Sequence, residues 1–258
     1  MPNDHHDIRA GGNPYASERA DVAAYAAARP QFPQQAIDFA LDGLAPGAVA
    51  VEVGAGTGIA TRQLAERGLT VYALEPSAQM VRVLRQNLRS QARVTVLDQP
   101  GEHILLPESC ADVVIYADSW HWIRQPEGRN QAQRIVKPHG RAVVLSNQLD
   151  VRQPWVHRLS RIMRSGDVVA TQPQPDLGTA FTSPERHVVE WSDAVAPSDI
   201  FALARTRASW IRADDAYRER MQQNLAWYLY EHLGLTDHST VRMPYCTFVW
   251  KATARSTH

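Results

Sequence analysis

The segment Glu52–Gly58 combines a carboxylate with closely spaced glycines, a combination typical of a ligand-binding loop. Gly54, Gly56 and Gly58 let the backbone turn tightly and approach a ligand closely, because no Cβ intervenes. Glu75 follows Gly58 by 17 residues and closes a second apolar run. A carboxylate in that place can accept hydrogen bonds from both hydroxyls of a ribose. Together the two features predict a site for a ribose-containing ligand.

The spacing of the glycines separates two classes of cofactor. A dinucleotide fold requires G-x-G-x-x-G, with a pyrophosphate resting on the helix N-terminus. This chain instead reads E-x-G-x-G-x-G, which resembles the first motif of class I S-adenosylmethionine-dependent methyltransferases. In that family the loop passes under the amino-acid portion of the cofactor. The resemblance therefore implies S-adenosylmethionine, and the residues it assigns to this loop are Glu52, Gly54, Ala55, Gly56 and Gly58.

Two later turns widen the resemblance. Glu75-Pro76-Ser77, with Met80 one turn on, resembles the ribose-binding turn of the family. Residues 99–102 occupy the place of its adenine-binding turn, so Gly101 and Glu102 are also assigned to the cofactor. Pro100 stands where many relatives offer an aspartate to the adenine amino group. That contact must come from another residue, and the candidates are Asp98, Gln99 and Glu102.

The N-terminal part of the chain adds a further match. Tyr25 and Arg29-Pro30 resemble the Tyr…Arg-Pro lead-in of the same family, so that the resemblance covers about residues 25–147. One interpretation is that Tyr25 and Arg29 close over the cofactor carboxylate. The alternative is that Arg29 merely ends a helix, since a residue before proline is pushed out of the α region.

The segment Tyr116–Trp122 is where the methyl acceptor is expected. It follows the fourth predicted strand, and ligands of open α/β sheets bind beyond the carboxyl ends of the strands. In the family this segment, with Ala117, faces the sulfonium side of the cofactor. Methyl transfer needs alignment above all, and a base only where the nucleophile starts protonated. His121 is the candidate base, because imidazole titrates near neutrality. The alternative is a structural histidine packed between Trp120 and Trp122.

The elements that must position these residues follow from hydrophobic patterning. Strands are expected at 48–53, 70–74, 94–97, 111–116, 142–145, 187–191 and 240–252, and helices at 61–67, 78–88, 129–136, 154–164, 198–206 and 214–233. Apolar strands separated by helices indicate parallel βαβ units, and the last strand suits an antiparallel position. The predicted fold class is α/β, a Rossmann-like doubly wound seven-stranded sheet with a helical lid insertion in the C-terminal half.

Four regions are expected: an N-terminal arm and cap helix (1–32), the cofactor-binding core (33–147), a substrate lid containing strand six (148–235) and the last strand (236–258). The aromatic residues of the third region suggest an apolar lid over the acceptor: Trp155, Trp191, Trp210, Trp227, Tyr228 and Tyr230. Arg205, Arg207 and Arg212 indicate either a carboxylate or phosphate in the acceptor or a solvated face. Core packing is the more frequent fate of any single aromatic residue.

Composition and charge limit the kinds of molecule that this protein is expected to bind. The formal net charge is +0, whereas a dedicated nucleic-acid binder carries a basic excess, and no N-P-P-Y-type tetrapeptide follows the fourth strand. We therefore expect a small-molecule acceptor, no nucleic acid and a monomer or homodimer. No run of about 18 apolar residues could span a membrane, and the polar start lacks an apolar signal region. Two cysteines without ligand spacing, and His5-His6 without a carboxylate, predict no metal site. A cytoplasmic protein is expected, with a role in secondary metabolism.

Three rival functions remain open at this stage. A protein of the same fold could use the cofactor site for cyclisation or elimination rather than methylation. A non-catalytic partner subunit would retain the fold with a blocked or empty cleft. A nicotinamide-dependent dehydrogenase is disfavoured by the spacing of the glycines.

Overall fold

The computed structural model describes residues 13–16, 20–166 and 173–255, which form one sheet with helices on both faces. The strands are β1 (Val49–Val53), β2 (Thr70–Leu74), β3 (Val94–Leu97), β4 (Ala111–Ala117), β5 (Val136–Leu149), β6 (Glu185–Val195) and β7 (Val241–Thr253). Their order is β3-β2-β1-β4-β5-β7-β6, and only β7 runs antiparallel to its neighbours. The predicted seven-stranded doubly wound sheet is confirmed, with its antiparallel last strand.

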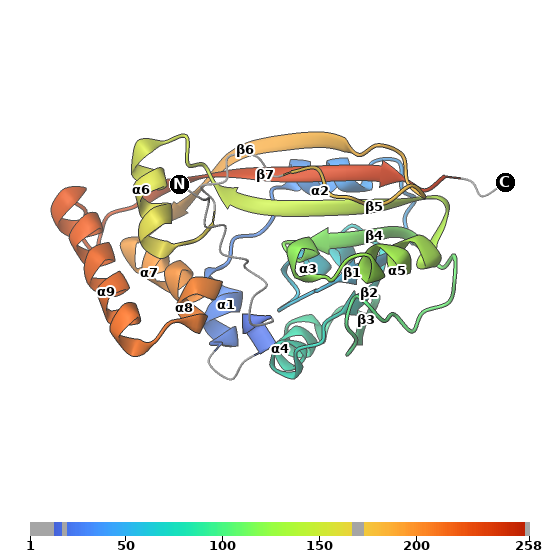
Figure 1. Ribbon diagram of the computed structural model, residues 1–258, viewed down its shortest axis with the longest axis horizontal. Helices are drawn as coiled ribbons and strands as arrows, with labels where there is room; N and C mark the ends of the chain where they lie inside the picture. Colours follow the sequence, from blue (N-terminus) through green and yellow to red (C-terminus); the bar gives the residue numbers. More distant parts are fainter. Residues whose placement is uncertain (1–12, 17–19, 167–172, 256–258) are drawn as a thin grey trace.

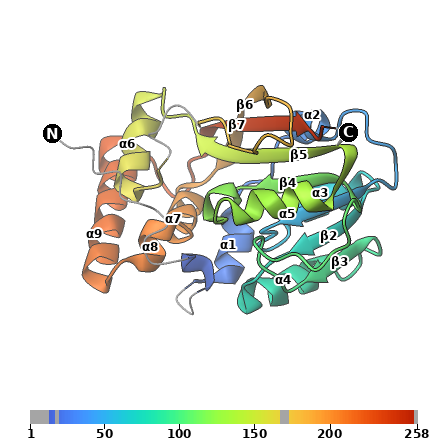
Figure 2. The same ribbon diagram turned by 45° about the vertical axis from the view of Figure 1, so that its right-hand side comes forward.

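The helical elements cover the sheet and one of its ends (Figure 1). They are η1 (Pro14–Ala16), α1 (Val22–Ala28), α2 (Gln34–Leu41), α3 (Ile59–Glu66), α4 (Ala78–Leu88), η2 (Trp120–Trp122), α5 (Glu127–Ile135), α6 (Pro154–Met163), α7 (Pro197–Arg205), α8 (Ala208–Arg212), α9 (Asp215–Ala226) and the π-helical η3 (Trp227–His232). Helices α6 to α9 gather beyond the carboxyl ends of β4 and β5, as Figures 1 and 2 both show. This arrangement supplies a roof over the edge of the sheet where ligands bind.

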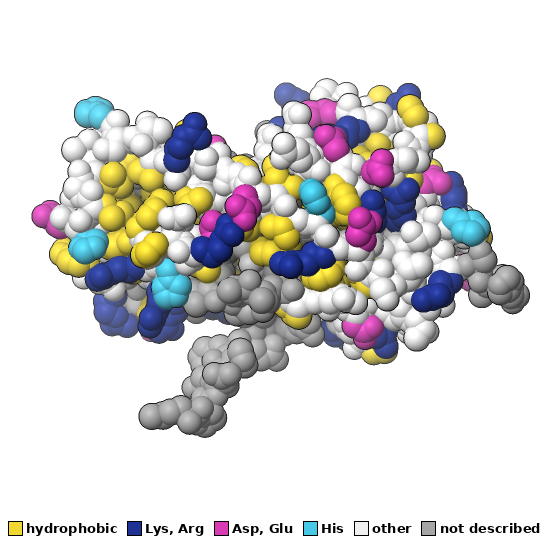
Figure 3. All heavy atoms as spheres, turned by 90° about the horizontal axis from the view of Figure 1, so that it is seen from above, with side chains coloured by type: hydrophobic (Ala, Val, Ile, Leu, Met, Phe, Trp, Pro, Cys, Tyr) yellow, Lys and Arg dark blue, Asp and Glu magenta, His cyan; other side chains and the backbone are white. Residues whose placement is uncertain are grey.

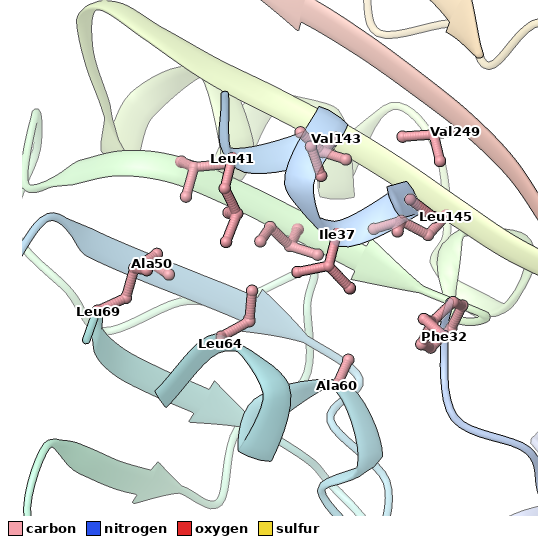
Figure 4. Packing of buried hydrophobic residues seen from close by; sticks show 14 of the residues in the cluster. Phe32, Ile37, Leu41, Ala50, Ala60, Leu64, Leu69, Val143, Leu145 and Val249 are labelled. Atoms are coloured by element: carbon pink, nitrogen blue, oxygen red, sulfur yellow. The ribbon is translucent and has the colours of Figure 1, made fainter. Parts of the chain in front are cut away.

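Strand alternation divides the apolar core between the two faces of the sheet. In β4, Val113 and Ile115 pack with α2 and α3, whereas Val114 and Tyr116 pack with α5. Successive side chains of a strand point to opposite faces, so this central strand is apolar throughout. Figure 4 shows the first of these clusters, in which Ile37 of α2 and Leu64 of α3 lie against the sheet.

The strand order creates the crevice of the site. The chain builds β1, β2 and β3 outward in one direction and then returns to place β4 on the other side of β1. The connections after β1 and β4 therefore diverge to opposite faces, which leaves a cleft at their carboxyl ends. The glycine loop follows β1, and the segment beginning at Asp118 follows β4.

The C-terminal half differs from expectation in its lengths. β5 covers 136–149 rather than 142–145, because its polar continuation pairs with β7 as far as Leu149. β6 covers 185–195 rather than 187–191, since β7 pairs with its whole length. Polar residues towards both ends of these strands break the apolar pattern and concealed their extent from the sequence. α8 was not predicted, and the expected helix at 214–233 changes to a π-helical turn at Trp227.

Charged side chains of both signs are interspersed over the face seen in Figure 3, where hydrophobic side chains gather towards the left end. In the part of the chain that the structure describes, no helix is long and apolar enough to cross a membrane.

Substitution of Ile37 tests the packing of α2 on the sheet. Its side chain is 1% exposed, so Ile37→Ala should lower the free energy of unfolding by about 2–4 kcal/mol through lost burial and a residual cavity. Chemical denaturation measures the change. Gln35→Ala, on the exposed side of the same helix, is the control and should remain within about 0.5 kcal/mol of wild type. Equal effects of the two substitutions would contradict the packing.

Candidate functional site

The glycine loop combines a close contact with open space. A Cβ on Gly54 would lie 2.6 Å from Cβ of Ser119, and one on Gly58 would lie 2.7 Å from Leu84 of α4. Gly56, with φ +58°, has no atom within 4 Å of its Cβ position. Gly54 and Gly58 therefore permit tight packing between elements, whereas Gly56 leaves room for a ligand.

Glu75 holds the loop in place. Its Oε2 accepts a hydrogen bond from the Gly56 N–H at 2.9 Å, and its Oε1 accepts one from the Ser77 N–H at 2.9 Å. Burial raises the pKa of Glu75, and these two backbone hydrogen bonds oppose the increase. A carboxylate has about four acceptor positions, so two remain for a ligand. The side chain lines the cavity described below, where ribose hydroxyls could occupy them.

The Glu52 side chain also has a hydrogen-bond partner within the fold. Thr61 of α3 donates its hydroxyl to Oε2 of Glu52 at 2.5 Å. Burial raises the pKa of Glu52 to about 8; the Thr61 hydrogen bond lowers it, and the negative charge of Glu75 raises it. Glu52 therefore anchors the start of α3 beside the loop, and it also lines the cavity.

A cavity of about 1640 Å³ joins these residues at the carboxyl ends of the strands. The predicted site residues that line it are Tyr25, Arg29, Glu52, Gly54, Ala55, Gly56, Glu75, Pro76, Met80, Gly101, Glu102, Ala117 and His121. Gly58 is not among the lining residues, since its position packs against α4. Thr57 also lines the cavity, and its buried hydroxyl has no hydrogen-bond partner among the described residues. A polar ligand would supply that partner, because buried polar groups are normally hydrogen-bonded.

Of the three residues predicted as candidates for the adenine contact, one lines the cavity. Asp98 is exposed and Gln99 accepts a hydrogen bond from the Leu105 N–H, and neither lines the cavity. Glu102 does line it, although one of its oxygens accepts the Arg124 N–H at 2.8 Å. Gly101 packs tightly against Val53 of β1: a Cβ at this position would lie 2.5 Å from the Val53 side chain.

Arg29 ends α1 and also lines the cavity, whereas its contact with a cofactor carboxylate stays a prediction. Its backbone N–H caps α1 by bonding the Tyr25 carbonyl, so it does end the helix. Its guanidinium also donates to Thr206 Oγ1 at 3.0 Å, to the Thr206 carbonyl at 3.1 Å and to the Tyr15 hydroxyl at 3.2 Å. Burial raises the pKa of Tyr25 to about 12, against the lowering effect of Arg29. These bonds fix the N-terminal segment to the α7–α8 junction at the cavity wall.

Asp118 is a cavity residue that the sequence analysis did not single out. It has the left-handed φ of +52°, and its Oδ1 accepts the Asn147 N–H at 3.0 Å. Burial raises the pKa of Asp118, while the charges of Arg29 and Arg207 lower it. Its place directly after the fourth strand was the available signal, because carboxyl ends of strands carry ligand-binding residues.

His121 lies on η2, where its ring centroid is 4.8 Å from that of Trp122. It is half-buried and lines the cavity, so the structure brings it to the same space as the glycine loop. Trp122 in turn makes an edge contact with Tyr15 of η1 at 5.9 Å.

The prediction that six aromatic residues form a lid over the acceptor is wrong, because these residues pack elsewhere. Trp155, Trp191, Trp210 and Tyr228 pack into the cluster between α6, α9 and β7, Trp227 is exposed, and Tyr230 stacks on Phe201. None of the six is among the described residues that line the cavity. Of the three arginines, Arg207 and Arg212 line the cavity, whereas Arg205 is exposed elsewhere. Aromatic residues look the same in sequence whether they build a core or a lid.

Within the described ranges, no group of three or more His, Cys, Asp or Glu residues could hold a metal ion. His5 and His6 lie outside these ranges.

The fold and the cavity define an α/β protein with a ligand-binding cleft at the carboxyl ends of its central strands, and comparisons with known proteins give the family. A family model described as a methyltransferase domain matches residues 51–144. An uncharacterized methyltransferase of Mycobacterium tuberculosis, Rv3342, is 33% identical over 236 residues, which cover 90% of this chain and 93% of that protein. An uncharacterized methyltransferase of Schizosaccharomyces pombe, C25B8.09, is 24% identical over 80% of this chain and 84% of its own length.

Solved structures agree on the fold. A protein of Anaeromyxobacter dehalogenans, proposed to be a type II methyltransferase, has a TM-score of 0.61 and 19% identity, covering 88% of this chain and 97% of its own. Phosphoethanolamine N-methyltransferase 2 of Haemonchus contortus, bound to S-adenosyl-L-methionine, has a TM-score of 0.52 and 14% identity, covering 91% of this chain and 57% of its own. This chain belongs to the class I S-adenosylmethionine-dependent methyltransferases, and S-adenosylmethionine is its cofactor. The dehydrogenase and non-catalytic alternatives are thereby set aside.

The raised pKa of Glu52 predicts a pH-dependent stability. Because its pKa is higher in the folded state than the ordinary value of 4.5, the folded protein binds more protons between pH 4.5 and about 8. The free energy of unfolding therefore falls as the pH rises through this window, by about 3 kcal/mol between pH 5 and pH 8. Glu52→Gln imitates the protonated form and should remove this decrease.

Urea denaturation of wild type and Glu52→Gln at each pH isolates the contribution, because the other titrating groups are common to both proteins. A difference between the two proteins that stays constant from pH 5 to pH 8 would contradict the assignment.

Proposed function

We propose that this enzyme transfers the methyl group of S-adenosylmethionine to an oxygen, nitrogen or carbon nucleophile of a small metabolite. The observation that carries the proposal is the size of the cavity beside the glycine loop, about 1640 Å³, beyond the roughly 300–1,000 Å³ of an ordinary ligand pocket. It has room for the cofactor beside the glycine loop and for a second molecule under α8. The acceptor is a small molecule rather than a nucleic acid.

The proposed cofactor contacts follow from the lining residues. Glu75 takes the ribose hydroxyls on its two remaining acceptor positions, and Glu102 faces the adenine. The open position at Gly56 and the unpaired Thr57 hydroxyl receive the amino-acid portion. Arg29, with Tyr25 beside its guanidinium at 4.9 Å, lies where it can interact with the carboxylate of that portion.

When bound, S-adenosylmethionine supplies a methyl group on a sulfonium, and its transfer to the acceptor's lone pair breaks the carbon–sulfur bond and leaves S-adenosylhomocysteine. The protein aligns the acceptor and keeps water away, which accounts for most of the required catalysis. For an acceptor that begins as O–H or N–H, His121 takes the proton. Its position on η2, directly after β4, lets it reach the cavity without interrupting the sheet.

Gly56→Arg tests the cofactor site. An arginine side chain would enter the space beside the loop, so the affinity for S-adenosylhomocysteine should fall at least a hundredfold by calorimetric titration. Gly68→Arg is the matched control: this glycine also has a positive φ (+80°) and an open Cβ position, but it does not line the cavity. Its affinity should stay within threefold of wild type. Unchanged binding in Gly56→Arg would overturn the site.

The reaction itself is tested with S-adenosylmethionine labelled in the methyl group and a panel of phenols, amines and carboxylic acids. Label in a product establishes methylation, whereas a product without label indicates that the cofactor site serves another reaction.

His121→Gln tests the base. With an O–H or N–H acceptor found in that panel, turnover should fall about a hundredfold or more and lose its decrease at acidic pH, while the affinity for S-adenosylhomocysteine stays unchanged. A variant that keeps the wild-type pH profile and rate shows that His121 is structural.

A further inference from the structure

The charged residues of the cavity are separated by sign. Its carboxylates lie on the sheet side, near the end of β1 and in the segments that follow β2, β3 and β4: Glu52, Glu75, Glu102 and Asp118. Opposite them, the segment from α6 to α8 contributes Arg161, Arg164, Arg207 and Arg212 and no carboxylate to the lining. The surface in Figure 3, by contrast, mixes both signs. Four arginines of a protein with a formal net charge of +0 therefore lie together on one side of the cavity.

Arg207 is the inner member of this group. It is 8% exposed, follows Thr206, and lies close enough to Asp118 to lower the pKa of that carboxyl. Since Asp118 directly follows β4 beside the glycine loop, Arg207 lies near the expected place of methyl transfer. Burial of an arginine is uncommon, because the charge loses its hydration.

Arg161 and Arg164 are the outer members. Both are exposed at the end of α6, and among the described residues neither forms an ion pair with a carboxylate. They also line a smaller hollow of about 630 Å³ that includes Arg158 and Arg220. Like charges gathered in this way repel one another and attract an anion.

The backbone of Arg164 supplies independent support. This residue ends α6 with φ +45° and ψ +48°, a left-handed conformation in which glycine is the usual residue. A residue with a Cβ is strained there relative to glycine, and such strain is concentrated at functional sites. The negative end of the α6 dipole explains a cation near the C-terminus of that helix but not one placed on this backbone.

Neighbouring bonds fix the arrangement. The hydroxyl of Ser209 in α8 donates to the Met163 carbonyl at 2.8 Å and so joins α8 to the end of α6. The hydroxyls of Ser160 and Ser165 lie 2.8 Å apart across the same turn. The three arginines are thus presented by two elements that are bonded to each other.

We propose that the methyl acceptor carries a carboxylate or phosphate group that is held by Arg161, Arg164 and Arg207. The inference rests on the proposed function and names the class of its substrate. Guanidinium groups bind both anions through paired, charge-assisted hydrogen bonds. Apolar lining from Trp122, Leu203 and Tyr245 accommodates the carbon skeleton between the anionic group and the methylated atom.

The experiment uses the full chain saturated with S-adenosylhomocysteine and three probes: 3-phenylpropionate, phenyl phosphate and the neutral 3-phenylpropionamide. Titration calorimetry at constant ionic strength should show at least tenfold tighter binding of one anion than of the amide. The tighter anion identifies the group as carboxylate or phosphate. Equal affinity for the amide and both anions overturns the inference.

Three variants locate the binding. Arg161→Gln/Arg164→Gln should weaken binding of the preferred anion at least tenfold, whereas the charge-matched Arg85→Gln/Arg89→Gln on the exposed side of α4 should stay within twofold. Arg164→Gly should also weaken binding of the preferred anion. The melting temperature of this variant should equal or exceed that of wild type, because glycine adopts the left-handed backbone without strain. Wild-type anion affinity in both Arg164 variants overturns the proposal.

The affinity for S-adenosylhomocysteine separates this inference from the proposed function. It should stay within threefold of wild type in all these variants. A parallel fall would mean that the arginines hold the cofactor carboxylate, which overturns the inference alone. Failure of the wild-type protein to bind S-adenosylhomocysteine overturns the proposed function and, with it, this inference.

Discussion

The buried carboxylate of Glu75 connects the two loops on which the cofactor site depends. By accepting the N–H groups of Gly56 and Ser77, it ties the loop after β1 to the turn after β2. Desolvation of a carboxylate costs free energy unless hydrogen bonds compensate, so the two loops and the acid stabilise each other. The N–H groups of Gly54 and Ala55 both bond the Leu74 carbonyl and secure the same junction. A site formed in this way exists before the ligand arrives.

A contact between the end of β1 and the segment after β4 stabilises the same junction. Ser119, after β4, donates its hydroxyl to the Val53 carbonyl at the end of β1 and closes on Gly54. The two central strands are thereby joined at their carboxyl ends, and Asp118 is turned into the cavity by its left-handed backbone. The requirement for glycine at position 54 thus comes from a protein contact, although the sequence motif associates it with the cofactor.

The parts of the fold that could be predicted are those set by local spacing. The first five strands follow from apolar runs, and the carboxylates at two strand ends, Glu52 and Glu75, indicate residues that line the cavity. The sequence does not distinguish Gly56, which faces open space, from Gly58, which packs on Leu84, because both carry the same residue type. Nor does it reveal that Arg29 bonds Thr206, 177 residues away, or that Trp155 packs in a core. Such outcomes depend on tertiary contacts that local pattern does not encode.

The Arg29–Thr206 contact also joins the two halves of the proposed reaction. Arg29 belongs to the N-terminal segment on the cofactor side, whereas Thr206 directly precedes Arg207 on the acceptor side. The guanidinium binds both the hydroxyl and the carbonyl of Thr206, so a displacement of either segment breaks charge-assisted hydrogen bonds. The wall of the cavity is therefore common to both ligands. In the proposed reaction, an acceptor bound by Arg207 contacts a segment that hydrogen bonds from Arg29 fix to the cofactor side. Such fixed relative positions are the alignment that methyl transfer requires.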